Sequence, residues 1–177
     1  FYGTANTNQM LMEFMGLHLP GASFVNPNTP PREAPTVAGV TRAARITRLG
    51  NDWRPVSAIL DERAFVNGLV GLMATGGSTN LVIHLPAMAR AAGVILDLQD
   101  FHDISQAVPL LARVYPNGSA DVNAFQAAGG VAFVARELAQ AGNIHSDVVT
   151  IMGQGIAHYF QEPSMVDGEL VWRDGVA

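Results

Sequence analysis

The stretch Ala74-Thr75-Gly76-Gly77-Ser78-Thr79-Asn80 is the most informative part of the chain. Two glycines followed by small hydrogen-bonding residues suit a tight turn that feeds a helix, whose free N–H groups can hold an anion. Apolar segments of helical character flank it at 69–73 and 81–86 and place the turn at the edge of a core. Pattern alone favours a plainer interpretation, a glycine C-cap joined to a serine N-cap between two helices. The stretch is nevertheless the first candidate for a ligand-facing loop.

Composition limits the classes of protein to be considered. The chain has 177 residues, of which 49% are hydrophobic and 14% charged, so it is long and apolar enough for one globular domain with a core. A net charge of −5 with no basic patch argues against nucleic acid, and no apolar run is long enough to cross a membrane. Cys and Lys are absent, which excludes disulfides, thiolate ligands and a Schiff-base lysine within these residues.

Helical spacing of apolar residues dominates the pattern. In the second predicted helix, Val37, Val40, Ala44 and Ile46 are expected to be buried, with Arg42, Arg45 and Arg48 along a solvated face. Pro86 is expected to kink or split the fourth. Residues 20–35 hold five prolines and are predicted to be irregular. The predicted helices span residues 7–15, 36–49, 61–74, 78–93, 100–107, 121–128 and 131–141.

Strand signals are few. The β-branched run 94–98 is the best strand candidate, and residues 110–115 could form a strand or an extended segment. Asp167-Gly168 between apolar neighbours indicates a hairpin or a linker. The sequence therefore predicts a helix-rich α/β fold.

The histidines do not pair with one another at metal-ligand spacing. His84 lies six positions after Ser78 and could act as a base near the loop. On an apolar helix face, however, a hydrogen-bonded core histidine is the favoured interpretation. The acidic pairs Asp61-Glu62 and Asp100…Asp103 stand where helices are predicted to begin, so capping accounts for them best.

Four segments together resemble one known family. They are Phe1-Tyr2-Gly3-Thr4-Ala5-Asn6-Thr7-Asn8-Gln9-Met10, Ala74 to Asn80, Ala89-Arg90-Ala91-Ala92-Gly93, and Arg113-Val114-Tyr115-Pro116-Asn117-Gly118 followed by Ala127-Ala128-Gly129-Gly130. This set resembles the dihydroxy-acid dehydratase and phosphogluconate dehydratase superfamily, and its first and last segments resemble the phosphogluconate branch most. Leu81-Val82 departs from that branch, where a more polar pair is expected after Asn80.

The resemblance implies a cytoplasmic hydro-lyase of the Entner–Doudoroff pathway, a homodimer at full length, which removes water from a sugar-acid phosphate, 6-phospho-D-gluconate. It implies a [4Fe-4S] cluster that binds the leaving hydroxyl as a Lewis acid, with a divalent cation as a further option. In the family the cluster cysteines and metal carboxylates precede the segment that matches Phe1, and the serine base lies downstream. We therefore expect an interior piece of a longer protein that alone holds no cluster and catalyses nothing.

The resemblance also divides the chain and assigns its residues. Residues 1–160 would be the last part of the cluster-binding N-terminal α/β domain, and 161–177 a linker or the start of a C-terminal β-barrel domain. The substrate side is expected at Gly76, Gly77, Ser78, Thr79 and Asn80, the cluster pocket at Tyr2, Gly3, Thr4 and Asn6, and a supporting role at His84. No catalytic residue and no metal ligand is expected in this chain. Two alternatives stay open, a dihydroxy-acid or other sugar-acid dehydratase, and a non-catalytic helical interaction module.

Overall fold

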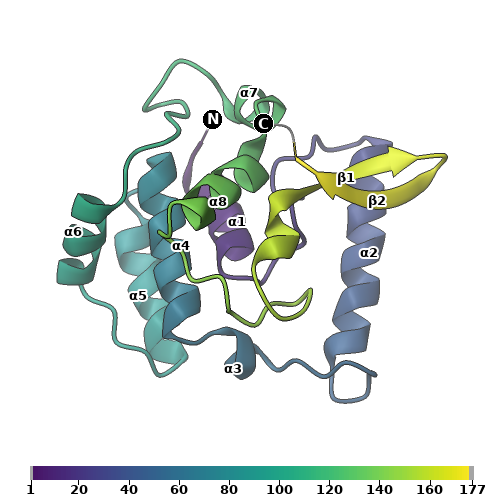
Figure 1. Ribbon diagram of the computed structural model, residues 1–177, viewed down its shortest axis with the longest axis horizontal. Coiled ribbons are helices and arrows are strands. Elements are labelled where there is room, and N and C mark those ends of the chain that lie inside the picture. The colour runs from purple at the N-terminus through teal and green to yellow at the C-terminus, as the bar shows by residue number, and fades with distance from the viewer. Residues whose placement is uncertain (1, 176–177) are drawn as a thin grey trace.

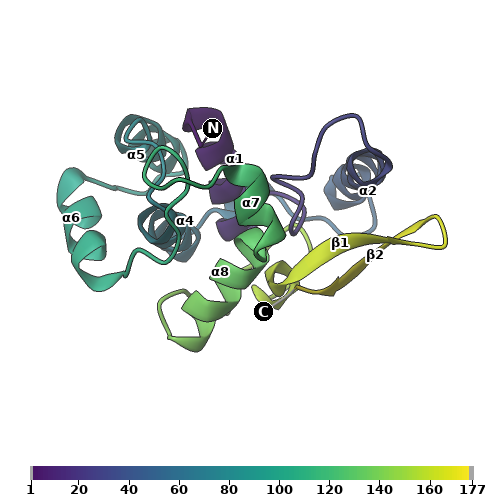
Figure 2. The ribbon, with the colours of Figure 1, turned by 90° about the horizontal axis from the view of Figure 1, so that it is seen from above.

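Helices make up most of the molecule (Figures 1 and 2). The computed structural model describes residues 2–175. The helices are α1 (Thr4–Phe14), α2 (Pro30–Ile46), α3 (Val56–Ile59), α4 (Glu62–Thr75), α5 (Leu81–Ala91), α6 (Leu98–Ala107), α7 (Val122–Ala127), α8 (Gly130–Gln140) and the 3₁₀ helix η1 (Ala157–Phe160). The strands β1 (Gln161–Val166) and β2 (Glu169–Asp174) form an antiparallel hairpin.

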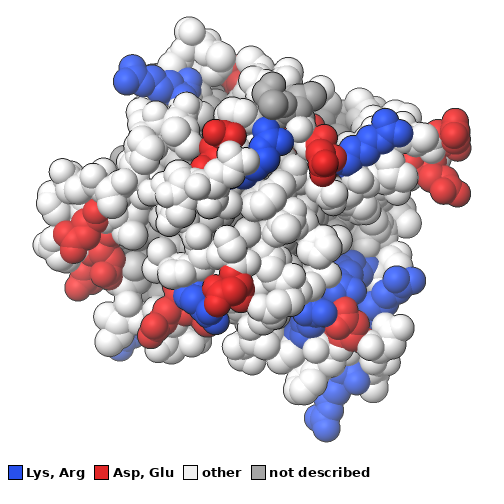
Figure 3. Space-filling view, in the orientation of Figure 1, with Lys and Arg blue, Asp and Glu red and all other residues white. Residues whose placement is uncertain are grey.

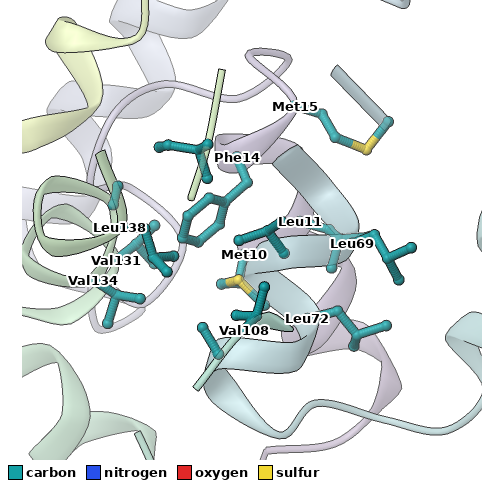
Figure 4. Close-up of a cluster of buried hydrophobic side chains, with 14 of the residues drawn as sticks. Met10, Leu11, Phe14, Met15, Leu69, Leu72, Val108, Val131, Val134 and Leu138 are labelled. Atoms are coloured by element: carbon teal, nitrogen blue, oxygen red, sulfur yellow. The ribbon is translucent and has the colours of Figure 1, made fainter. Parts of the chain in front are cut away.

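The core is built around α1. Its Met10, Leu11 and Phe14 are at most 1% exposed. Figure 4 shows them between side chains of α8 on one side and of α4 on the other. Burying large apolar side chains of this kind contributes about 1.5–3 kcal/mol each. Helix α1 is therefore the central element of the core.

Two glycines explain how closely α1 approaches α4. A Cβ atom at Gly71 would lie 2.5 Å from Cδ2 of Phe14, and one at Gly68 would lie 2.8 Å from Cγ of Met15.

Helix α4 starts where the sequence predicts, because the Asp61 side chain accepts a hydrogen bond from Ala64 N at 3.0 Å. The predicted helix at 61–74 is thus confirmed to within a residue.

The prediction for α2 is wrong in two respects. The helix begins at Pro30, six residues earlier than predicted, because proline is tolerated in the first helical turn. Val37 and Val40, expected in the core, are 61% and 69% exposed, and Ala44 is also exposed. The reason is visible in Figure 1, where α2 stands apart from the main body and meets the hairpin instead.

The basic stripe of α2 is solvated only in part. Figure 3 shows basic side chains gathered around an acidic one over the C-terminal end of this helix. Arg42 turns inward, pairs with Asp52 at 2.6 Å and donates through Nε to the carbonyl of Ile151. Arg54 pairs with the same carboxylate at 3.0 Å, and these two guanidinium groups lower the pKa of Asp52. Arg45 and Arg48 are exposed as predicted.

The strand predicted at 94–98 does not form. Asp97 instead accepts hydrogen bonds from Gln99 N and Asp100 N, and the Asp100 carboxylate accepts one from Asp97 N, which makes a capping box. The helix α6 therefore begins at Leu98, before the predicted start at Asp100. A short β-branched run needs a neighbouring strand, and residues 94–97 pair with none among those that the structure describes.

The remaining elements largely follow the sequence. α5 begins at Leu81 and stays a single helix with Pro86 inside it, so the predicted split is wrong. Asp121 caps α7 as predicted, and α8 follows the Gly129-Gly130 interruption. Asp167 and Gly168, with φ of 51° and 84°, form the tight turn of the hairpin. The helix-rich character is confirmed, while the described residues 2–175 contain no parallel sheet.

Candidate functional site

Three segments that are distant in sequence meet at one end of the core. The hydroxyl of Tyr2 lies 2.9 Å from Thr75 Oγ1, and the Tyr2 amide donates to the carbonyl of Tyr115 at 3.0 Å. Asn117 donates through Nδ2 to the carbonyl of Gly76. The start of the chain, the loop between α4 and α5, and the turn at 115–118 therefore form one unit. Each of these three segments carries part of the family resemblance.

The two glycines of the loop are needed for different reasons. Gly76 is left-handed, with φ of 59°, and its amide closes α4 by donating to Leu72 O. Gly77 lies so close to α1 that a Cβ atom there would be 2.6 Å from Cγ2 of Thr7 and 2.8 Å from Cδ1 of Leu72. The glycine C-cap predicted from the sequence is confirmed, and the second glycine permits close contact with α1.

Hydroxyl and amide side chains join the loop to the first turn of α1. Thr4 Oγ1 and Ser78 Oγ are 2.9 Å apart, and Asn80 Nδ2 donates to Thr4 Oγ1 at 2.8 Å. Ser78 Oγ also accepts from Asn80 N at 3.3 Å. The predicted substrate-side residues Ser78 and Asn80 and the predicted pocket residue Thr4 thus form one network.

Most backbone amides of the loop are not free to form an anion cradle, the less favoured interpretation of this stretch. The amides of Gly77, Ser78, Asn80 and Leu81 already donate to Leu72 O, Thr7 Oγ1, Ser78 Oγ and Ser78 O, respectively. Asn80, rather than Ser78, occupies the N-cap of α5, and its side chain bonds to Thr4 instead of capping the helix. Any ligand contact must therefore come mainly from side chains.

Side chains at the rim leave donors available. Of the two hydroxyl hydrogens on Thr4 and Ser78, one serves their mutual bond, and the other has no acceptor within residues 2–175. Thr79 is exposed and its hydroxyl has no partner in the described part of the chain. The Asn80 side-chain oxygen adds an acceptor. Such a rim can bind the hydroxyl, carboxylate or phosphate oxygens of a small polar molecule.

Tyr2 and Gly3 lie beside this network and bond to the residues that hold it, Thr75 and Thr7. Tyr2 is 3% exposed, and burial raises its pKa to about 12, which the hydrogen bond to Thr75 only partly offsets. Its phenol is therefore neutral at physiological pH and acts as a hydrogen-bonding group rather than a base. Gly3 caps α1, and its carbonyl accepts from the Thr7 amide and hydroxyl at 3.0 and 2.9 Å.

Two predicted residues lie outside the network. Asn6 faces a different pocket of about 240 Å³, between α1 and α7, which Phe24, Asn26 and Asn123 also line. His84 is exposed on the first turn of α5, so the core-histidine interpretation is wrong. Its neighbours Val82 and Ile83 are exposed too.

Sequence reasoning missed two residues that hold the loop. Thr7 was noted only as a helix-starting residue, yet its hydroxyl accepts the Ser78 amide at 3.0 Å. Asn117 stands in one of the segments that resemble the family but is assigned no role there, and it donates to the Gly76 carbonyl. Both contacts span long sequence separations, so no local pattern signals them.

The described residues do not supply a metal centre. No group of three or more His, Cys, Asp or Glu side chains in residues 2–175 is arranged to hold a metal ion, and the sequence has no cysteine. Thiolate ligands for an iron–sulfur cluster would have to come from other parts of a longer protein. Among the described helices, none is both long and apolar enough to cross a membrane.

Comparison with known proteins gives the family. Residues 1–159 match the family described as Dihydroxy-acid/6-phosphogluconate dehydratase N-terminal. The chain belongs to this family. The match covers all three segments of the network, so the family assignment and the geometry concern the same residues.

Individual relatives agree with the family. The chain is 56% identical over 175 residues to a phosphogluconate dehydratase of Escherichia coli strain K12, which covers 99% of this chain and 29% of the relative. It is 60% identical over 174 residues to that of Rhizobium meliloti, covering 98% and 29%. A dihydroxy-acid dehydratase of Ignicoccus hospitalis is 39% identical over 170 residues, covering 95% and 30%. The chain thus spans about three tenths of the length of these curated relatives.

Proposed function

We propose that this chain is a segment of a phosphogluconate dehydratase, a hydro-lyase that converts 6-phospho-D-gluconate into 2-dehydro-3-deoxy-6-phosphogluconate and water. Identities of 55–60% to phosphogluconate dehydratases of several bacteria, against 39% to the dihydroxy-acid dehydratase of Ignicoccus hospitalis, support this branch. The family match leaves the hypothesis of a non-catalytic interaction module without support.

The observation that carries the structural part of the proposal is the bond between Thr4 and Ser78. It joins the two most distinctive motifs of the chain into one polar rim. We assign the substrate side of the site to this rim, with Ser78, Thr79 and Asn80 contacting hydroxyl or anionic oxygens of the sugar acid. Tyr2, Gly3 and Thr4 shape the wall beside it. Asn6 and His84 lie away from the network, so the proposal gives them no contact with the substrate.

The proposal assigns the bond-breaking groups to other parts of the full-length enzyme. The [4Fe-4S] cluster, any divalent cation and the base belong there, since the described residues provide no ligand set. The proposed domain boundary lies near residue 160, and the end of the family match at 159 supports it. A homodimer at full length and a cytoplasmic location belong to the same proposal.

A substrate comparison tests the function. The full-length enzyme that carries this segment is assayed with 6-phosphogluconate, with unphosphorylated gluconate and with a branched 2,3-dihydroxy acid. We expect kcat/KM to be highest for 6-phosphogluconate by at least about tenfold, which corresponds to about 1.4 kcal/mol of differential transition-state binding. Equal or better turnover of either unphosphorylated acid would contradict the proposal and favour the alternative, a dihydroxy-acid or other sugar-acid dehydratase.

A further inference from the structure

Thr7 is a buried residue that joins the two motif segments by a hydrogen bond to the backbone of the loop. It lies in the first turns of α1 and is fully buried. Its hydroxyl donates to the carbonyl of Gly3 at 2.9 Å and accepts from the amide of Ser78 at 3.0 Å. One side-chain oxygen thus bridges the start of the chain and the loop, which are 71 residues apart along the sequence.

The methyl group of Thr7 contributes separately. It fills the space that a side chain at position 77 would need, since a Cβ there would approach Thr7 Cγ2 to 2.6 Å. The hydroxyl therefore fixes the position of the Ser78 amide relative to α1, while the methyl group limits how closely Gly77 approaches α1. Threonine carries both a hydroxyl and a methyl group on Cβ, and the bond to the Ser78 amide depends on the hydroxyl alone.

Other contacts of the loop cannot replace this one. Asn117 holds the carbonyl of Gly76, one residue before Gly77, and Thr4 holds the side chains of Ser78 and Asn80. Only Thr7 holds the amide of Ser78 among the residues that the structure describes. The Ser78 amide shares its peptide plane with the Ser78 Cα, so the bond to Thr7 fixes the backbone position from which the Ser78 side chain projects.

We infer that Thr7 is a positioning residue for the substrate loop, which acts through Ser78 and touches no substrate itself. The inference deepens the proposed function and rests on it for its kinetic consequence only. Its structural consequence, a loop held by one buried hydroxyl, is independent of the substrate.

Two substitutions separate the hydroxyl from the methyl group. In the full-length enzyme, Thr7→Val keeps the shape and removes the hydroxyl, whereas Thr7→Ser keeps the hydroxyl and removes the methyl. Thr41→Val is the matched control, because the Thr41 hydroxyl also bonds to the carbonyl four residues earlier, at 2.9 Å, but is exposed and reaches no second segment. Amide hydrogen exchange of the peptide that covers residues 74–82 and steady-state kinetics with 6-phosphogluconate are measured for each.

We expect Thr7→Val to speed exchange of the loop peptide and to raise KM roughly three- to tenfold with a smaller change in kcat, because the hydroxyl's hydrogen bonds to the Gly3 carbonyl and the Ser78 amide are both lost. Thr7→Ser is expected to exchange and turn over much like the wild type. The inference is overturned if Thr7→Val matches Thr41→Val in both measurements, or if Thr7→Ser is as impaired as Thr7→Val. If the wild type does not turn over 6-phosphogluconate, the proposed function fails, while the exchange data still decide the role of Thr7.

Discussion

At the scale of single residues, the loop shows why two adjacent glycines need not be equivalent. Gly76 is required for its left-handed backbone, and Gly77 for the space that α1 occupies beside it. The dipeptide Gly-Gly predicts a turn, but only the folded structure shows which glycine is needed for its backbone conformation and which for a close contact. Substitution should therefore affect the two positions through different contacts.

Replacing Gly77 by alanine should destabilise the fold by about 1–3 kcal/mol, since the added methyl overlaps Thr7 and Leu72. Gly39→Ala is the matched control within α2, where the nearest atom to the new Cβ, Leu19 Cδ1, lies at an ordinary 3.5 Å. It should stabilise the helix by about 0.5–1 kcal/mol. Thermal unfolding of the full-length enzyme measures both changes. A Gly77→Ala variant as stable as the wild type would show that α1 is free to move away from the loop.

At the scale of elements, one buried carboxylate fixes the chain that leaves α1. Glu13 is fully buried, and its oxygens accept from the amides of Gly21 and Ser23 at 2.7 and 2.8 Å. Burial raises the pKa of Glu13, and the hydrogen bonds and His18 oppose the shift only in part. Tyr159, which donates to the His18 carbonyl at 2.9 Å, closes the same region from the other side.

Glu13→Gln should destabilise the protein by about 1–3 kcal/mol at low pH, because the amide group offers one acceptor where two amides donate. The pKa of Glu13 is raised on folding, so its titration contributes stability that is present below pH 4.5 and lost as pH rises through the folded pKa. Glutamine does not titrate there. The difference in melting temperature between wild type and variant should therefore narrow with rising pH, and a widening difference would contradict the assignment.

The elements that the sequence predicts well are those with local signals. Asp61 and Asp121 begin their helices where a capping residue predicts it, and Asp167-Gly168 forms the expected hairpin. The errors arise where tertiary contacts decide. The 94–97 run finds no partner strand and ends in a helix cap, and α2 packs on the hairpin rather than on the core.

The same limit applies to the candidate site, of which the sequence predicts only part. Ser78, Asn80, Thr4 and Tyr2 could be selected because they stand in motifs that resemble the family. The structure joins the first three by hydrogen bonds and bonds Tyr2 to Thr75. Thr7 and Asn117 could not, since their roles depend on hydrogen bonds across 71 and 41 residues. The backbone anion cradle failed because the same amides found partners inside the protein.

At the scale of the whole molecule, apolar surface lies next to the site. Ile83, on the first turn of α5, is 68% exposed, and Leu110 and Leu111 are each 45% exposed beside the loop. Ile95, which is 90% exposed, lies near Glu62 and Phe65 at the start of α4, the end of that helix opposite the loop. Exposed apolar area of this kind is typical of a surface that another part of a protein covers.

The 177-residue polypeptide, if produced alone, should self-associate at micromolar concentration through its exposed apolar side chains. Light scattering after size-exclusion chromatography measures its mass. Replacing Ile83 and Ile95 by serine should lower the associated fraction, whereas Ser105→Ala, an exposed position without apolar area, should not. A strictly monomeric wild-type polypeptide would contradict the expectation.

The central claim is that the rim formed by α1 and the loop lines the substrate side of a phosphogluconate dehydratase. The most direct measurement is the steady-state kinetics of the full-length enzyme that carries Ser78→Ala together with Thr79→Ala. Thr41→Ala together with Ser105→Ala is the control, because both hydroxyls are exposed and bond only to their own helices. We predict a loss of roughly tenfold or more in kcat/KM for the first pair, with an unchanged fold, and none for the control. Unchanged kinetics in the Ser78 and Thr79 variant would contradict the account.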